Sequence, residues 1–152
     1  MYVTLRFGFA TKKLMDIENT IIQALQSTFS EEYLLDVNVS ERAMVHRFAV
    51  HLEDKFPGYR VDCEYNRNHY VPKTLDGHKR YPDIIVHKRC TPDNLLVIEV
   101  KKSTVKDDAF VSEKEKLFEY KNQLGYKEAY LIILPVRESE SKSNPSEYIE
   151  QI

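Results

Sequence analysis

The sequence predicts an α/β fold in which one central sheet of short apolar strands carries helices packed against it. Two kinds of segment lead to this prediction. Runs of β-branched and aliphatic residues have the length of buried strands, and they lie at 81–88, 94–102 and 128–135. Longer segments repeat apolar residues every three or four positions, as an amphipathic helix does, and they lie at 16–29, 40–56 and 112–125. With a further strand at 59–66, the expected order is helix, helix, strand, strand, strand, helix, strand.

The two central strands carry charges where core strands normally carry none. They are Tyr81–Lys88 and Asn94–Lys102, and the segment between them has turn composition. In the second strand, alternation places Glu99 and Lys101 on the same face, at the end of an apolar run. Because a lone buried charge is costly, we expect these side chains to be paired, to bind a metal or to lie at the mouth of a cleft. Asp83, at the start of the preceding strand, is the expected neighbour.

The helix expected over 40–56 contributes another acidic residue. Ser40 is a plausible N-cap, and Pro57 with Gly58 ends the helix. Glu41 lies four residues before Val45 and so continues the apolar stripe that faces inward. Two interpretations stay open for Glu41: it complements the helix dipole in the first turn, or it reaches the cluster of charges on the sheet.

The other segments give simpler expectations. Strand 59–66 alternates, which places Cys63 on its buried face and Glu64 on its polar face. Residues 67–80 show no periodicity and are expected to form an exposed loop. The loop is either a basic patch for a polyanion or merely solvated, and its basic or potentially basic residues are Arg67, His69, Lys73, His78, Lys79 and Arg80.

Ends of elements are marked by capping residues. Ser112 opens a capping box, so the third helix is expected to begin there and to end at Gly125. Asn144-Pro-Ser-Glu147 has the form of the start of a short final helix. A weak edge strand is expected over 2–9, and a polar, disordered segment over 137–144.

Composition favours a single soluble domain. A chain of 152 residues can bury a sizeable core. It contains no apolar run of membrane-spanning length and no pattern typical of a signal peptide. Two cysteines, Cys63 and Cys90, do not form a disulfide framework, so a reduced, cytoplasmic location is expected. The net charge of −2 gives no overall attraction to nucleic acid, so a polyanion would need a local basic patch or a bound metal.

Three carboxylates and a lysine are therefore expected to converge at one end of the sheet: Glu41, Asp83, Glu99 and Lys101. Hard divalent cations such as Mg²⁺ prefer oxygen ligands, usually one or two carboxylates completed by water and phosphate. A metal held in this way activates water, and a lysine beside it can position that water or neutralise charge on the phosphate. This combination of residues is suited to phosphodiester hydrolysis.

The same residues resemble the PD-(D/E)xK nuclease superfamily, which includes type II restriction endonucleases and archaeal Holliday-junction resolvases. The resemblance lies in Pro82-Asp83, Glu99-Val-Lys101 and an inward-facing glutamate on the preceding helix. The superfamily's common core is a helix, a three-stranded meander, a helix and a strand, and residues 40–134 follow that order. Within the superfamily, the chain looks like a group of uncharacterised prokaryotic proteins. Residues 1–39 would be an N-terminal helical extension and 136–152 a C-terminal tail.

The resemblance implies a restriction endonuclease-like core, with a central mixed four-stranded sheet flanked by helices, and a magnesium- or manganese-dependent endonuclease acting on DNA. Asp83 and Glu99 would be metal ligands, with the Val100 carbonyl as a third ligand and Glu41, the accessory acidic residue, as a further member of the metal site. Lys101 would be the catalytic lysine. Many members of the superfamily act as dimers, so a homodimer is one expectation. Whether the substrate is duplex DNA, a junction, a single strand or RNA stays open, and a role in defence, repair or mobile-element biology rests on analogy alone.

Residues around this cluster supply the remaining candidates. Lys102, Arg67 and Lys116 are candidates for contact with nucleic acid, although a solvated surface charge is the simpler explanation for each of them. Glu64 is a secondary candidate for the site.

Other interpretations of the cluster stay open. Lys101 with Asp83 or Glu99 can form a structural ion-pair network without catalysis. A nuclease-like scaffold can also bind nucleic acid or a protein without cutting. A zinc site would draw on residues whose spacings do not match known zinc motifs, namely Cys63, His69, His78, His87 and Cys90.

Overall fold

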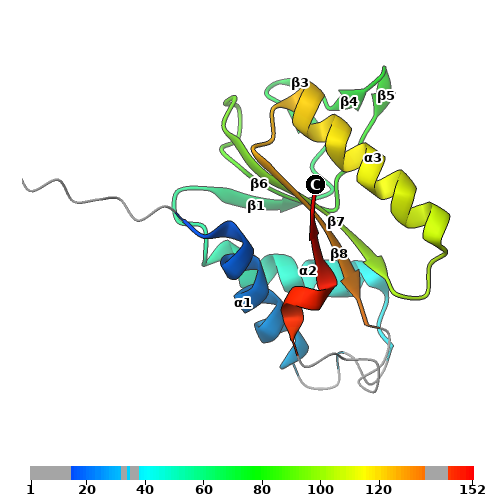
Figure 1. The fold of residues 1–152 in the computed structure, drawn as a ribbon. Helices are drawn as coiled ribbons and strands as arrows, with labels where there is room; N and C mark the ends of the chain where they lie inside the picture. The colour runs from blue at the N-terminus through cyan, green and yellow to red at the C-terminus, as the bar shows by residue number, and fades with distance from the viewer. Residues whose placement is uncertain (1–14, 32–33, 35–37, 136–143) are drawn as a thin grey trace, which may run out of the picture.

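The computed structural model describes residues 15–31, 34, 38–135 and 144–152. Its centre is a mixed five-stranded sheet in the order β1-β6-β7-β8-β9, and three α-helices accompany this sheet (Figure 1). The strands of the sheet are β1 (Arg60–Cys63), β6 (Ile84–His87), β7 (Asn94–Lys102), β8 (Glu128–Leu134) and β9 (Ile149–Gln151). The helices are α1 (Ile17–Phe29), α2 (Glu41–Glu53) and α3 (Asp107–Leu124), with a 3₁₀ helix, η2 (Pro145–Tyr148), before β9.

The sheet begins with an antiparallel meander. β1 pairs with β6 and β6 with β7, both antiparallel, and α3 then carries the chain to β8, which pairs parallel to β7. The predicted order of the helices and of the strands of this central sheet from 16 to 134 is therefore confirmed. The predicted number of four strands is wrong, because β9 adds a fifth strand antiparallel to β8. β9 has only three residues and no apolar run, and only its pairing with β8 makes it a strand.

Helices cover both faces of the sheet (Figure 1). One face packs on α1 and α2 through the even-numbered residues of β7, Leu96, Ile98 and Val100. The other face packs on α3, where Val97 meets Leu117 and Tyr120. The alternation of β7 predicted from the sequence thus separates two cores, and Glu99 and Lys101 lie on the α3 side.

The segment 67–80 corrects the sequence prediction of an irregular loop. It forms two small hairpins, β2 (Arg67–Asn68) with β3 (Val71–Pro72), and β4 (Thr74–Leu75) with β5 (His78–Lys79). The second hairpin turns at Asp76 and Gly77, both with positive φ, as a two-residue Asp-Gly turn requires. Lys73, expected to be an exposed cation, is only 1% exposed and joins the hairpins through main-chain hydrogen bonds to Asn66 and Arg80.

Strand β1 also differs from its expected two-faced pattern. Cys63, predicted to be a core residue, is exposed. Asp62, two residues before Glu64 and so on the face predicted to be polar, accepts hydrogen bonds from the buried His87 and from Arg89. Helix α2 packs against β1, but the strand has only four residues: Arg60 and Cys63 at its ends are exposed, and Val61 and Asp62 between them are partly buried. Exposure therefore depends on the position along this short strand and does not alternate.

Helix α3 begins at Asp107, five residues before the predicted start at Ser112. Its first turn contains Asp107 and Asp108, which favour a helix N-terminus, and Phe110 packs on the core beneath α3. The predicted end is confirmed, since Gly125 follows the helix in the left-handed conformation (φ 68°). The predicted final helix is confirmed as η2, where the Asn144 side chain accepts a hydrogen bond from the amide of Ser146.

The expected edge strand over 2–9 and most of the expected disordered segment over 137–144 lie outside the described residues. Among the residues that are described, no helix is both long and apolar enough to cross a membrane.

Candidate functional site

The candidate site lies where β7 continues past the start of β6. Ile84, the first residue of β6, pairs with Ile98, so none of the described strands pairs with the last residues of β7 on that side. Two acidic side chains take the place of the missing strand. The amide of Val100 donates to Asp83 Oδ2 (2.7 Å), and the amide of Lys102 donates to Glu41 Oε2 (3.1 Å). Unpaired strand amides thus hold both carboxylates at one edge of the sheet.

The Val100 carbonyl faces the same edge. On the other side of β7, the amide of Ser103 donates to the Leu134 carbonyl of β8. The main-chain N–H and C=O groups of the odd-numbered residues therefore point toward β8, and those of the even-numbered residues point away from it. In a strand, the N–H and C=O of one residue point to the same side. Since the Val100 amide points to Asp83, its carbonyl oxygen also lies on the side of Asp83, as the metal-ligand expectation requires.

Glu99 is a buried carboxyl group beside Asp83. It is 1% exposed, and its Oε1 atom has no hydrogen-bond partner among the residues that the structure describes. Burial raises the pKa of Glu99 well above its usual range, and the neighbouring charges of Asp83 and Glu113 raise it further, against the attraction of Lys116. A buried carboxyl group next to a second carboxylate is an arrangement that a bound cation would stabilise.

Two lysines surround these acids. Lys101 Nζ lies 3.5 Å from Glu41 and 3.7 Å from Glu113, and these acids raise its pKa although burial opposes them. Lys116 Nζ lies 2.6 Å from Glu113 and 3.4 Å from Glu99. Glu41, Asp83, Glu99 and Lys101 are therefore gathered at one end of the sheet, as the sequence predicted.

Access to this site is uneven. A hollow of about 350 Å³ opens beside Glu41 and Asp83. Its other lining residues come from α2 and from the end of β1, and they are Arg42, Val45, His46, Cys63 and Glu64. Glu64 lies on the rim and pairs with Arg42 (3.0 Å). Glu99 does not line this hollow, so solvent reaches Asp83 and Glu41 more readily than Glu99.

The candidates for nucleic-acid contact differ in their surroundings. Lys102 Nζ donates to the Val39 carbonyl (2.6 Å) and to Asn38 (3.0 Å), so it fixes the segment before α2. Lys116 is engaged with Glu99 and Glu113. Arg67 is exposed at the start of β2. The structure brings Lys116 into the site and leaves Arg67 outside it.

Sequence reasoning missed Glu113. This residue contacts Lys101 and Lys116 and thereby connects α3 to the site. A signal was present, because Glu113 lies four residues before Leu117 and continues the inward stripe of α3, as Glu41 continues the stripe of α2. Arg42 and His46, on the rim of the hollow, follow Glu41 by one and five positions and gave no comparable signal.

Within the described part of the chain, no group of three or more His, Cys, Asp or Glu side chains is arranged to hold one metal ion. Glu41 is turned toward the Lys102 amide and Lys101, so only Asp83 and Glu99 come together. One or two carboxylates completed by water and phosphate oxygens are enough for Mg²⁺. The unpartnered Glu99 Oε1, the adjacent Asp83 and the Val100 carbonyl therefore fit a hard divalent cation, with Glu41 outside its immediate ligands.

Comparisons with protein-family models, curated proteins and solved structures gave no match for this chain.

Proposed function

We propose that this protein is a metal-dependent phosphodiesterase, an endonuclease acting on DNA, built on a restriction endonuclease-like core. The observation that carries the proposal is the pairing of Asp83 with the buried Glu99 at the open edge of β7, within one cluster with Lys101 and Glu41. The order helix, meander, helix, parallel strand supports the proposed core.

Each residue has a role that follows from its position. Asp83, Glu99 and the Val100 carbonyl would hold Mg²⁺ or Mn²⁺, which when bound supplies an activated water and positive charge beside the phosphate. Lys101 stays protonated, because the surrounding acids raise its pKa, and it can donate hydrogen bonds to a phosphate or to the attacking water. Glu41 orients Lys101 and fixes the end of β7 through the Lys102 amide.

The test is cleavage of supercoiled plasmid, junction and RNA substrates with Mg²⁺ or Mn²⁺. We expect Asp83→Asn and Lys101→Met to abolish cleavage. Asparagine keeps an oxygen that can accept from the Val100 amide, so Asp83→Asn removes the charge with little disturbance of the strand. Asp54→Asn and Lys79→Met are matched controls at exposed positions. Cleavage that persists in purified Asp83→Asn protein would refute the proposal.

A second candidate is a nuclease-like scaffold that binds nucleic acid or a protein without cutting, with the charges forming a structural network. The ion pairs of Lys101 and Lys116 with Glu41, Glu99 and Glu113 favour it. Calorimetric titration with Mn²⁺ separates the two candidates. The nuclease predicts binding that is lost in Asp83→Asn, and the structural network predicts no binding to either protein.

A further inference from the structure

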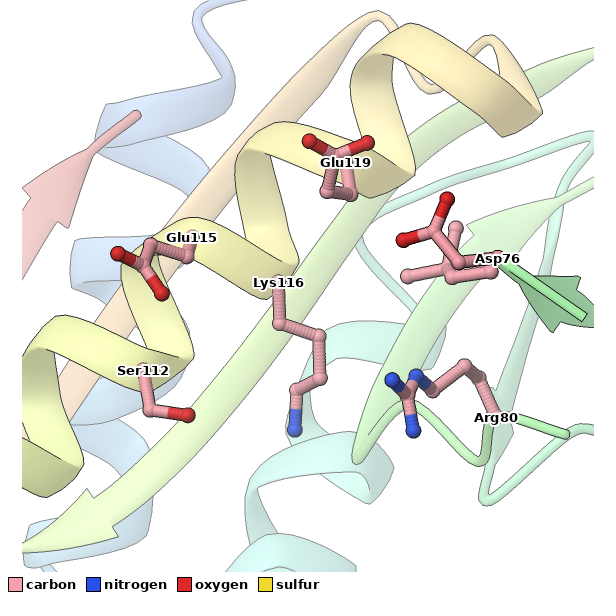
Figure 2. A pocket seen from close by; sticks show the side chains of 7 residues that line it. Asp76, Arg80, Ser112, Glu115, Lys116 and Glu119 are labelled. Atoms are coloured by element: carbon pink, nitrogen blue, oxygen red, sulfur yellow. The ribbon is translucent and has the colours of Figure 1, made fainter. Parts of the chain in front are cut away.

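A second hollow, of about 660 Å³, lies between α3 and the hairpin β4–β5. Its lining includes side chains from α3 and from the hairpin segment, several of them charged (Figure 2). They are Leu75, Asp76, Arg80, Ser112, Glu115, Lys116 and Glu119. None of the roles proposed for Asp83, Glu99, Lys101 or Glu41 uses this hollow.

Charges are not mixed evenly over its surface. Figure 2 shows Asp76 and Glu119 together at one end, and Arg80 and Lys116 with their nitrogens pointing toward a common space at the other. The two acids are tied together by Gln123, whose Nε2 donates to Asp76 (3.1 Å) and Glu119 (2.6 Å). Asp76 and Glu119 are thus engaged by hydrogen bonds within the protein. The third acid of the lining, Glu115, lies on the side of Ser112 and apart from Arg80 in Figure 2, so that the space between Arg80 and Lys116 presents hydrogen-bond donors.

Arg80 is the unusual member. Its guanidinium forms no ion pair with any carboxylate among the described residues, and its Nε atom is buried without a hydrogen-bond partner. A buried N–H group of this kind loses its hydrogen bond to water and gains none in return, which is costly unless a ligand supplies the acceptor. Guanidinium groups match the geometry of phosphate oxygens.

The hollow also adjoins the candidate site. Lys116 lines it and lies 3.4 Å from Glu99, so one lysine contacts both places. Arg80 and Glu99 both lie near the buried Tyr120 hydroxyl, since burial and the charge of Glu99 raise the pKa of Tyr120 and the charge of Arg80 lowers it. A phosphate bound by Arg80 and Lys116 would therefore lie beside the proposed metal ligands and on the α3 side of the sheet.

We infer that this hollow is a phosphate subsite, in which Arg80 and Lys116 bind the phosphate of a nucleotide adjacent to the cleaved bond. The inference deepens the proposed nuclease function and rests on it. The nucleic-acid strand would run from the cluster at the end of β7 along α3 toward the hairpin β4–β5. The side chain of Arg80, which has no hydrogen-bond or ion-pair partner among the described residues, is the specific recognition group, and Lys116 supplies a second charge.

The test is binding of a fluorescently labelled single-stranded oligonucleotide in EDTA, measured by anisotropy at low salt, where no cleavage occurs. Arg80→Met is compared with Lys79→Met, which removes the same charge from the neighbouring exposed position. We expect Arg80→Met to weaken binding at least about tenfold, because a charged hydrogen bond is lost, and Lys79→Met about twofold or less. Arg80→Met breaks no side-chain hydrogen bond to the part of the chain that the structure describes, and its circular dichroism is expected to match that of the wild type.

Competition with inorganic phosphate distinguishes two ligands that the hollow could take, a free phosphate ion and the phosphate of a nucleic-acid strand. Displacement of the oligonucleotide from the wild type by millimolar phosphate, with no such effect on Arg80→Met, would assign the hollow to phosphate in general. Loss of oligonucleotide binding in Arg80→Met without displacement by phosphate would assign it to a strand. Equal binding by Arg80→Met and Lys79→Met would overturn the inference.

The outcome is independent of cleavage. If Arg80 proves necessary for binding and no metal supports cleavage, Arg80 binds a nucleic-acid phosphate, but the nuclease proposal fails together with the placement of that phosphate next to a cleaved bond. If the plasmid is cleaved and Arg80→Met binds like the wild type, the nuclease proposal stands and the phosphate subsite fails.

Discussion

Lys73 gives a prediction that depends on the fold and not on the proposed function. Its side chain is 1% exposed, and its Nζ donates to the Tyr126 hydroxyl (2.7 Å) and lies over the rings of Tyr65 and Tyr126. Burial lowers the pKa of Lys73 from 10.5 to about 8, although the charges of Asp62 and Glu99 oppose the shift. The protonated form is therefore disfavoured in the folded protein.

The sign of the effect follows from these two pKa values. Above pH 10.5 the lysine is neutral in the folded and unfolded chains, and folding pays no penalty. Below pH 8 it is protonated in both, and the full penalty applies, about 3 kcal/mol at about 1.4 kcal/mol per pKa unit. This contribution of Lys73 to the free energy of unfolding therefore rises as the pH increases from 8 to 10.5.

The perturbation is Lys73→Met, which keeps an unbranched side chain and removes the ammonium group. The variant leaves the Tyr126 hydroxyl without its donor at every pH, which is a constant cost. We therefore compare the free energy of unfolding of Lys73→Met with that of the wild type at each pH. This difference should favour the variant by about 2 to 3 kcal/mol more at pH 7 than at pH 10. Urea unfolding followed by far-ultraviolet circular dichroism measures this difference, and it does not depend on tryptophan, which the chain lacks.

Lys79→Met is the control, because Lys79 lies in the same pair of hairpins and is exposed. The difference in the free energy of unfolding between Lys79→Met and the wild type should not change with pH. If the difference in the free energy of unfolding between Lys73→Met and the wild type varied by less than about 0.5 kcal/mol between pH 7 and pH 10, the lowered pKa of the buried Lys73 would be refuted.

Three further predictions follow from single contacts. Glu99→Gln should stabilise the protein at pH 7, because the raised pKa of Glu99 means that its ionised form is disfavoured in the folded protein. This gain in the free energy of unfolding should disappear below pH 4.5, where Glu99 is protonated in the folded and unfolded chains. Urea unfolding at pH 4 and pH 7 tests this, and equal gains at the two pH values would contradict it. Asp62→Asn should destabilise by about 2 kcal/mol at pH 7. Although burial opposes it, the hydrogen bonds from His87 and Arg89 hold the pKa of Asp62 below its usual 3.8, so the wild type should lose this advantage as the pH falls below 3.8, and an effect independent of pH would count against the ion pair. Ser40→Ala should cost about 1 kcal/mol, since the Ser40 hydroxyl accepts from the Ala43 amide at the start of α2, and an unchanged thermal midpoint would show that this cap is not needed.

Local sequence signals predicted most helix and strand positions. Ser40 caps α2 and Gly125 follows α3 in the left-handed conformation, as their residue types indicated. The signal for the hairpin β4–β5 was also present, because Asp76-Gly77 is a typical two-residue turn. It was missed because the flanking strands have only two residues each, too few for a periodicity.

The start of α3 and the strand β9 could not be predicted from capping patterns. Residues before Ser112 are helical because acidic side chains favour the first turn and Phe110 packs on the core. β9 exists because the edge of β8 offers unpaired main-chain groups. Both depend on parts of the chain that are distant in sequence.

The sequence by itself determined the alternation of β7, and therefore that Glu99 and Lys101 share a face, because side chains alternate in any strand. It also determined the order of the elements that bring Asp83 beside β7. Only the tertiary structure decided which acids share a site: β6 begins opposite Ile98, so the amides of Val100 and Lys102 were left for Asp83 and Glu41. Packing of α3 on the sheet likewise brought Glu113 and Lys116 into the candidate site. The Nε of Arg80 is also buried only in the folded structure. The side chains that meet between a helix and a sheet depend on how the two elements pack and not on local sequence.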